Sequence, residues 1–194
     1  AGAESIRSVE LATMTRPADR NDGRARMVEL RAVEDGFPYY GVLRLADGAT
    51  YHHGLLRGFG VIVRPELLAQ LDVKVGDALS IGSQRYTIRG VIESEPGRRL
   101  GAFSMGPRVF VDLADLEKSG LMGFGSRMTN QRLVKVADAQ LDPLVRTLRA
   151  DFVNEFARVR SYQATEDDIG EDFARAENYL SLVGLVVVIL GGIG

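Results

Sequence analysis

The stretch at residues 61–95, VIVRPELLAQLDVKVGDALSIGSQRYTIRGVIESE, has the clearest secondary-structure pattern in the chain. It opens with an apolar run, VIV, that predicts a strand and stops just before Pro65. Proline suits the first turn of a helix, because its missing N–H has no partner there in any case. A short helix is therefore predicted over 66–71, with its three leucines on one face.

The second half of this stretch predicts a turn and a hairpin. Gly76 and Asp77 favour a turn, because glycine adopts a positive φ without steric cost and aspartate can hydrogen-bond its own backbone. Apolar and polar residues then alternate over 78–82 and again over 86–91, across a short polar connection. Two such runs in succession predict the two strands of a β-hairpin.

The residues before this stretch predict mainly strands. Residues 5–14 and 26–33 both alternate, and the polar segment between them ends in Asp-Gly, so the two runs predict another hairpin. FPYYG at 37–41 predicts a bend and a short strand, and 49–60 reads as a glycine-punctuated loop. The first part of the chain, to about residue 112, is therefore expected to be β-rich.

The residues after about 112 mix strands and helices. A buried-type strand is predicted over 105–111 and a short helix over 114–119, which stops at a glycine as helices commonly do. A strand over 127–136 precedes an amphipathic helix over 138–156, with apolar residues three and four apart. We therefore expect an α+β fold whose second part, about 113–165, is of α+β type.

Composition limits the classes of function. The chain has 194 residues, 45% of them apolar, and a formal net charge of −2, so it can bury a core and has no basic block for nucleic acid. Cysteine is absent, which excludes disulfides and thiolate metal sites. Charged residues within 1–14 argue against a signal peptide there.

The sequence contains no recognisable catalytic, phosphate-binding or metal-binding motif. His52 and His53 are the only histidines. Adjacent strand residues point to opposite faces and cannot easily chelate one metal ion, so we expect an ordinary loop pair with no ligand role, whose replacement by alanine leaves folding nearly unchanged. Neither G-x-S-x-G nor H-E-x-x-H occurs, and the glycines of 120–125 lack the Gly-Lys-Ser/Thr of a phosphate loop. The sequence predicts no catalytic, cofactor-binding or metal-ligating residue and no cofactor.

Two charged segments have simple structural interpretations. PGRRLG at 96–101 could touch a partner or lipid headgroups, but two arginines flanked by glycines are adequately explained as a solvated turn. Asp167 and Asp168 are explained by a predicted helix N-terminus, where the helix dipole favours negative charge.

The last residues, YLSLVGLVVVILGGIG at 179–194, are uncharged. The run would reach about 24 Å at a rise of ~1.5 Å per residue, short of the ~30 Å hydrocarbon core, so we expect the beginning of a transmembrane helix over 178–194. A buried core helix is the alternative, but four glycines are unfavourable in a soluble helix and frequent in membrane helices.

Several segments, taken in order, carry a family resemblance. The LLAQL helix is followed by VKVGDALSIG and YTIRGVIESEP, and the order resembles the extracytoplasmic core domain of ABC-transporter permeases of the FtsX, LolC/LolE and MacB superfamily. FPYYG at 37–41, MGPRVFVDLADLEKSGL at 105–121 and GSR at 125–127 are similar to the YbbP-like permeases of that superfamily. The resemblance covers nearly the whole chain, and its specificity comes from the order and spacing of the pieces.

The resemblance implies a MacB-like periplasmic core domain over 1–177, placed between the first and second transmembrane helices of a permease. Such a domain is non-catalytic and couples ATP hydrolysis by a cytoplasmic ABC ATPase subunit to export or extraction of a lipid, lipoprotein or other hydrophobic substrate. The implied partners are that ATPase, a second permease copy or an extracytoplasmic protein, and the lipid membrane, with no nucleic acid. The implied location is the inner membrane, with this domain on the periplasmic side. A membrane-anchored hydrolase or binding module remains the alternative.

Overall fold

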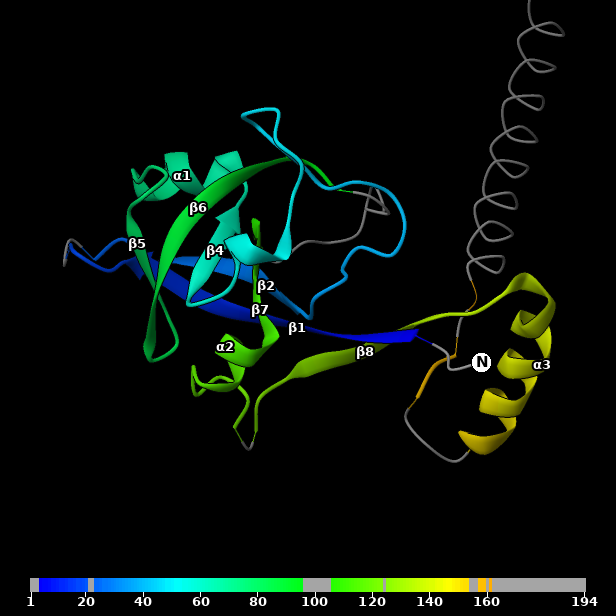
Figure 1. Cartoon of the computed structure of the whole chain (residues 1–194). Helices are drawn as coiled ribbons and strands as arrows, with labels where there is room; N and C mark the ends of the chain where they lie inside the picture. The colour runs from blue at the N-terminus through cyan, green and yellow to red at the C-terminus, as the bar shows by residue number, and fades with distance from the viewer. Residues whose placement is uncertain are drawn as a thin grey trace, which may run out of the picture. The chain divides into compact units, whose positions relative to one another are not determined.

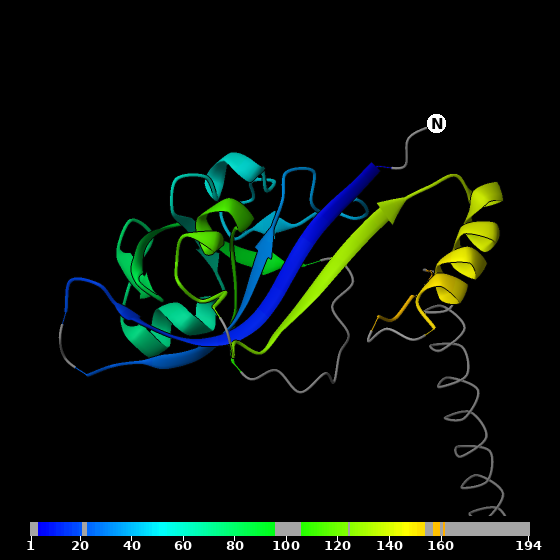
Figure 2. The same ribbon diagram turned by 90° about the horizontal axis from the view of Figure 1, so that it is seen from below.

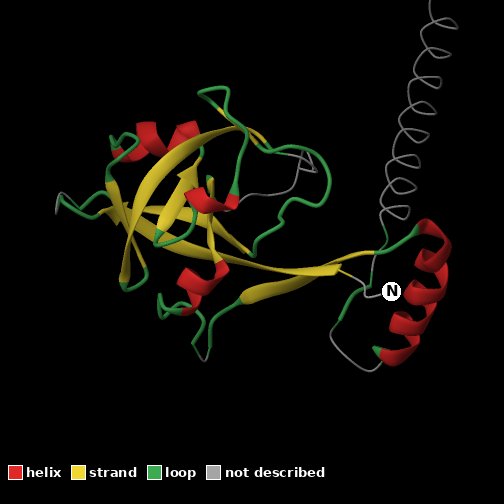
Figure 3. Cartoon of the chain, viewed as in Figure 1, coloured by secondary structure: helices red, strands yellow, loops and turns green. Residues whose placement is uncertain are grey.

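The structure, a computed structural model, describes residues 4–20, 23–95, 106–123, 125–153, 157–159 and 161. The chain divides into two compact units, residues 1–135 and 136–194. Strands dominate the described part of the first unit, and its helices are short (Figures 1 and 3). The strands are β1 (Glu4–Pro17), β2 (Arg26–Val33), β3 (Arg44–Leu45), β4 (Gly60–Val63), β5 (Ala78–Ile81), β6 (Gln84–Ser94), β7 (Arg108–Asp112) and β8 (Met128–Lys135). The helices are the 3₁₀ turn η1 (His53–Leu55), α1 (Pro65–Leu71) and α2 (Leu113–Glu117), and α3 (Asp138–Asp151) belongs to the second unit.

Six strands of the first unit pair in a closed ring. The hydrogen-bonded path runs β2–β7–β4–β6–β5–β1, and a further pairing of β1 with β2 closes it. The β2–β7 and β4–β6 pairs are parallel, and the other neighbours in the ring are antiparallel. Ring closure gives each of these strands partners on both edges, so the unit is a barrel (Figure 1).

The long strand β1 belongs both to the barrel and to a ladder beyond it. Along one edge it pairs with β2, in a register that runs from Ser8 opposite Val33 to Thr15 opposite Arg26. Along the other edge its last residues pair with β5, whereas residues 4–11 pair with β8. Figure 2 shows β1 and β8 running side by side.

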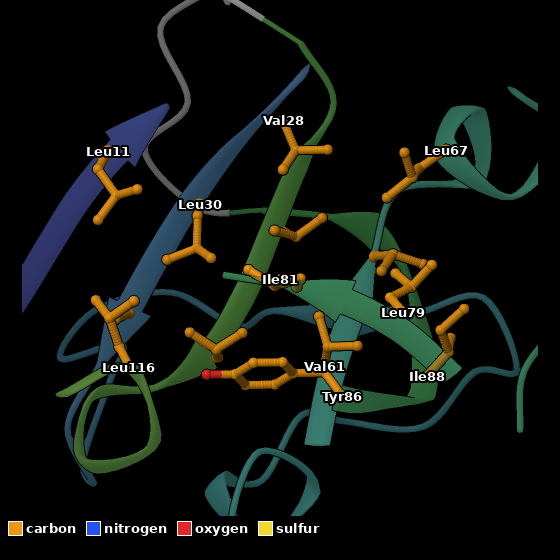
Figure 4. Close-up of a cluster of buried hydrophobic side chains, with 14 of the residues drawn as sticks. Leu11, Val28, Leu30, Val61, Leu67, Leu79, Ile81, Tyr86, Ile88 and Leu116 are labelled. Atoms are coloured by element: carbon orange, nitrogen blue, oxygen red, sulfur yellow. The ribbon is translucent and has the colours of Figure 1, made fainter. Parts of the chain in front are cut away.

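The barrel interior is filled by apolar side chains from every strand of the ring. Tyr86 and Ile88 show the alternation expected of β6, because Thr87 between them is exposed. Helices α1 and α2 add leucines, and Leu67 of α1 and Leu116 of α2 lie at opposite sides of the cluster (Figure 4). The barrel is therefore a packed core.

A second apolar cluster covers the outer side of β4, β6 and β7. The segment between β2 and β4 contributes Phe37, Leu43, Leu45, Tyr51 and Leu56, which pack with strand residues such as Ile62 and Phe110. All four residues of β4 are buried because one face points into the barrel and the other lies under this segment. Burial on both faces explains the unbroken VIV run in the sequence.

Most elements predicted from local pattern are present. The helix over 66–71, the hairpin of β5 with β6 and the hairpin of β1 with β2 are confirmed within a few residues. The predicted loop at 49–60 contains the turn η1. The helix predicted over 138–156 ends at Asp151, since Phe152 has left helical geometry with ψ near 16°.

The predicted transmembrane segment, residues 178–194, lies outside the described residues. Within the described ranges, no helix combines enough length and enough apolar character to cross a membrane.

Candidate functional site

The most conspicuous polar feature of the first unit is a buried carboxylate surrounded by three guanidinium groups. The Glu95 side chain, only 1% exposed, follows the end of β6. Its Oε1 lies 2.6 Å from Nη1 of Arg108 and 3.5 Å from Nη1 of Arg31, and its Oε2 lies 3.4 Å from Nη2 of Arg64. One carboxylate thus joins residues carried by β2, by β7 and by the segment after β4.

Two further carboxylates complete this group. Glu10 Oε1 lies 3.2 Å from Nε of Arg31, and Glu29 Oε1 lies 2.7 Å from Nη2 of Arg108. We call the six residues the Glu95 cluster: Glu10, Glu29, Arg31, Arg64, Glu95 and Arg108. Its three positive and three negative charges balance, as is required of charges removed from water.

Burial and pairing have opposite effects on these arginines. Burial lowers the pKa of Arg31, although Glu10 acts in the opposite direction. Burial also lowers the pKa of Arg108, but hydrogen bonds to Glu29 and Glu95 more than offset it, so the pKa is raised. Phe37 adds a ring face 4.8 Å from the Arg31 guanidinium carbon. Arginine side chains stay charged near neutral pH. Arg31 and Arg108 therefore connect strands through ion pairs and do not take part in proton transfer.

His53 is a buried structural residue. Its Nδ1 lies 3.1 Å from the Tyr51 hydroxyl, and its Nε2 lies 3.3 Å from Oδ2 of Asp112. The other oxygen of Asp112 accepts a hydrogen bond from the Ala114 backbone N–H, so the same carboxylate caps α2. Burial raises the pKa of Tyr51, with a further effect from nearby carboxylates. The contacts of His53 with Tyr51 and Asp112 thus connect η1 to the start of α2.

This geometry corrects one sequence-based prediction. We expected His52 and His53 to be an equivalent loop pair, yet only His52 is exposed. Because both ring nitrogens of His53 are engaged, its replacement by alanine removes the partner of the buried Tyr51 hydroxyl and the partner of Asp112 Oδ2. The expectation that replacing both histidines leaves folding nearly unchanged is therefore withdrawn for His53.

The remaining sequence-based candidates have separate outcomes. The basic segment 96–101 and the acidic pair Asp167 and Asp168 lie outside the described residues. Among the described positions, no group of three or more His, Cys, Asp or Glu side chains is arranged so that it could hold a metal ion.

Sequence reasoning missed the Glu95 cluster. Its members pair over long separations, such as the 79 positions between Glu29 and Arg108. A charged residue on an alternating strand, such as Arg31, looks like an ordinary solvated position. The one available signal was a charged residue next to each apolar run, Arg64 after Val63 and Arg108 before Val109, and that signal does not identify a partner.

The fold is shared with a solved periplasmic region and a solved extracellular domain. One is the periplasmic region of MacB from Actinobacillus actinomycetemcomitans, with a TM-score of 0.56, 11% identity and coverage of 86% of this chain and 75% of that one. Another is the extracellular domain of the noncanonic ABC-type transporter YknZ from Gram-positive bacteria, with a TM-score of 0.51, 16% identity and coverage of 78% and 77%. At such identities the likeness concerns the fold alone.

Sequence comparison identifies the family. Residues 2–151 match the family described as MacB-like periplasmic core domain, and the chain belongs to that family. It is also 30% identical over 190 residues to an uncharacterized ABC transporter permease, YbbP, of Escherichia coli strain K12. The match covers 97% of this chain but 22% of that relative, so the chain spans about a fifth of the permease's length.

Proposed function

We propose that this chain is the non-catalytic extracytoplasmic part of an ABC transporter permease subunit. In this proposal, residues 1–177 lie on the periplasmic side of the inner membrane and residues 178–194 begin a transmembrane helix. A cytoplasmic ABC ATPase hydrolyses ATP, and the domain converts the resulting motion into export or extraction of a lipid, lipoprotein or other hydrophobic substrate. The family match and the similarity to a permease over 97% of the chain support this assignment.

The mechanical part of the proposal rests on the positions of the first and last strand residues of the first unit. Glu4, at the start of β1, is directly opposite Lys135, at the end of β8. Residues 4 and 135 therefore lie at the same end of the β1–β8 ladder, and in this proposal the rest of the permease is attached to the first unit at that end. A body attached at one end moves as a lever when that end is displaced.

The interior of the first unit is suited to such rigid-body motion. The ring of strands is closed by hydrogen bonds, the core is packed, and the Glu95 cluster joins β1, β2 and β7 to the segments that follow β4 and β6. Packed interiors shift between discrete arrangements more readily than they deform continuously. Motion applied at residues 4 and 135 is thus passed on to the whole barrel.

The alternative, a membrane-anchored hydrolase, finds no support in the environment of His53. Its two ring nitrogens already contact Tyr51 and Asp112, so neither is positioned to activate a serine.

An insertion in the full-length permease tests the proposal. The permease is reconstituted with its ATPase in liposomes, and ATP-dependent extraction of a fluorescently labelled phospholipid is measured with and without a Gly-Gly-Ser-Gly insertion after Lys135. We expect ATP hydrolysis to remain measurable and extraction to be lost, because a flexible linker no longer transmits displacement.

A second insertion provides the control. The same four residues placed after Gly48, in an exposed turn, leave both connections of the lever intact and should preserve extraction. Extraction at the wild-type rate by the Lys135 insertion would contradict the lever. Failure of the wild-type permease to extract phospholipid in an ATP-dependent way would contradict the lipid as substrate.

A further inference from the structure

Two methionines form an exposed apolar pair on the outer face of the barrel. Met14 of β1 is directly opposite Met27 of β2, and the two residues are 51% and 48% exposed. Residues directly opposite on antiparallel strands place their side chains on the same face of the sheet. Single exposed apolar residues are ordinary, but here two long, adaptable side chains lie next to each other in water.

A cationic row lies beside this pair. Arg16 is two positions beyond Met14 on β1 and so shares its face. Arg16 is directly opposite Ser80 of β5, and Ser80 is in turn opposite Arg85 of β6, so two arginines flank a serine across three neighbouring strands. We call Met14, Met27, Arg16 and Arg85 the Met–Arg face.

The charges of this face are available to a ligand. Among the described residues Arg16 makes no ion pair. Arg85 pairs with Asp19, but both side chains are more than half exposed, and exposed pairs contribute little and exchange readily. Glu29, the acid nearest to Met27 on β2, already pairs with Arg108.

A pocket of about 260 Å³ lies beside Met14 and the two arginines. Met14, Arg16 and Arg85 contribute to its lining, together with the hydroxyl side chains of Ser80 and Ser83. Gly82 and Gln84 also line it. No carboxylate is among the lining residues, so the pocket is suited to an anion.

We propose that the Met–Arg face binds an acidic segment of a partner protein. In the bound state, an apolar side chain of the segment packs on Met14 and Met27, and a neighbouring carboxylate enters the pocket between Arg16 and Arg85. Charge complementarity selects an acidic segment, and methionines adapt to partners of different shape. An acyl chain is disfavoured, because Met14 and Ala25 are the only apolar side chains that line the pocket.

Methyl NMR of the 194-residue chain in lipid nanodiscs provides the test. The chain has five methionines, and Met122 and Met128 pack against the core, so their ¹³C-methyl signals serve as internal references. The probes are the peptides acetyl-Glu-Leu-Glu-Phe-Glu-amide and acetyl-Lys-Leu-Lys-Phe-Lys-amide. We expect the acidic peptide alone to shift the Met14 and Met27 signals, in a saturable way.

A pair of charge reversals makes the test specific. Arg16→Glu should weaken binding of the acidic peptide about tenfold or more, which corresponds to ~1.4 kcal/mol or more. Arg132→Glu makes the same change of charge at an exposed position of β8 and should leave the affinity unchanged. Unchanged Met122 and Met128 signals show that each variant is folded.

Three outcomes would overturn the proposal. The first is equal binding of the acidic and basic peptides, and the second is the absence of any shift at Met14 and Met27. The third is a response to sodium laurate without a response to the acidic peptide, which would identify the face as a lipid site. The surface is defined by the barrel alone, so none of these outcomes depends on the transport assay.

Discussion

The replacement Glu95→Gln tests whether the Glu95 cluster holds the barrel together. It removes one negative charge while nearly keeping the size of the side chain. The three arginines of this buried site are then left with two carboxylates, Glu10 for Arg31 and Glu29 for Arg108. Among the described residues, Arg64 is the arginine that loses its one ion-pair partner.

The expected loss of stability follows from this geometry. Removing one partner of a buried ion pair costs about 3–5 kcal/mol, because the remaining charge stays uncompensated. Glutamine keeps one oxygen that can accept from Arg108, so we expect the lower end, about 3 kcal/mol. For a unit of this size that corresponds to a fall of roughly 10 °C in Tm.

Urea unfolding monitored by far-UV circular dichroism measures the loss. Urea is preferred to guanidinium chloride, which would screen the ion pairs under test. Glu93→Gln is the matched control, because it makes the same chemical change two residues away at an exposed position. The control should stay within about 0.5 kcal/mol of wild type.

A second substitution distinguishes loss of charge balance from general damage. Arg64 Nε is buried, and within the described structure it has no hydrogen-bond partner. Adding Arg64→Met to Glu95→Gln restores charge balance and should recover about 1 kcal/mol or more. The hypothesis that the Glu95 cluster stabilises the barrel is wrong if Glu95→Gln lowers the free energy of unfolding no more than Glu93→Gln does. It is also wrong if the double variant is no more stable than Glu95→Gln alone.

Three further substitutions test local features, each by thermal unfolding. Tyr86→Phe should raise the free energy of unfolding by about 1 kcal/mol, because the hydroxyl is buried and has no hydrogen-bond partner among the described residues. Burial also raises the pKa of Tyr86, so above about pH 10, where the unfolded tyrosine ionises first, wild type should lose stability relative to this variant. Parallel pH profiles of stability for the two proteins would contradict the burial of the hydroxyl. His53→Ala should cost about 2 kcal/mol, because the buried Tyr51 hydroxyl loses its hydrogen bond and Asp112 loses its contact with the imidazole, whereas His52→Ala should be nearly neutral. Equal effects of the two substitutions would show that His53 is not structural. Gly60→Ala should cost about 1–3 kcal/mol, because a Cβ there overlaps the Leu55 backbone carbonyl. Gly123→Ala is the control and should change stability little, because a Cβ there meets no close atom. An unchanged Tm for Gly60→Ala would argue against the packing of η1 on Gly60.

Local sequence pattern was sufficient for the elements whose partners are close in the chain. Helix α1 follows from Pro65 and the spacing of its leucines, and the hairpin of β5 and β6 follows from alternation on both sides of a short turn. These structures depend on residues a few positions apart, so periodicity and turn chemistry decide them. The order of the same pieces also indicated the family, which the match over residues 2–151 confirms.

Tertiary structure alone decided which strand edges meet. Alternation predicts which face of β2 is buried, but it does not predict that β2 pairs in parallel with β7, or that β1 pairs with three different strands. Closure of the ring depends on these distant pairings, because local pattern specifies the faces of a strand and leaves its edges undetermined.

The polar sites follow the same rule. Glu95 lies next to its arginines, and Met14 lies next to the residues of β5 and β6 that line the pocket, only because strands distant in sequence are brought side by side. A charged or apolar residue at an outward position looks the same in sequence whether it faces water or a partner. Those residues acquired their roles from the closed barrel, whereas the helices and hairpins that build it were determined by their own neighbours.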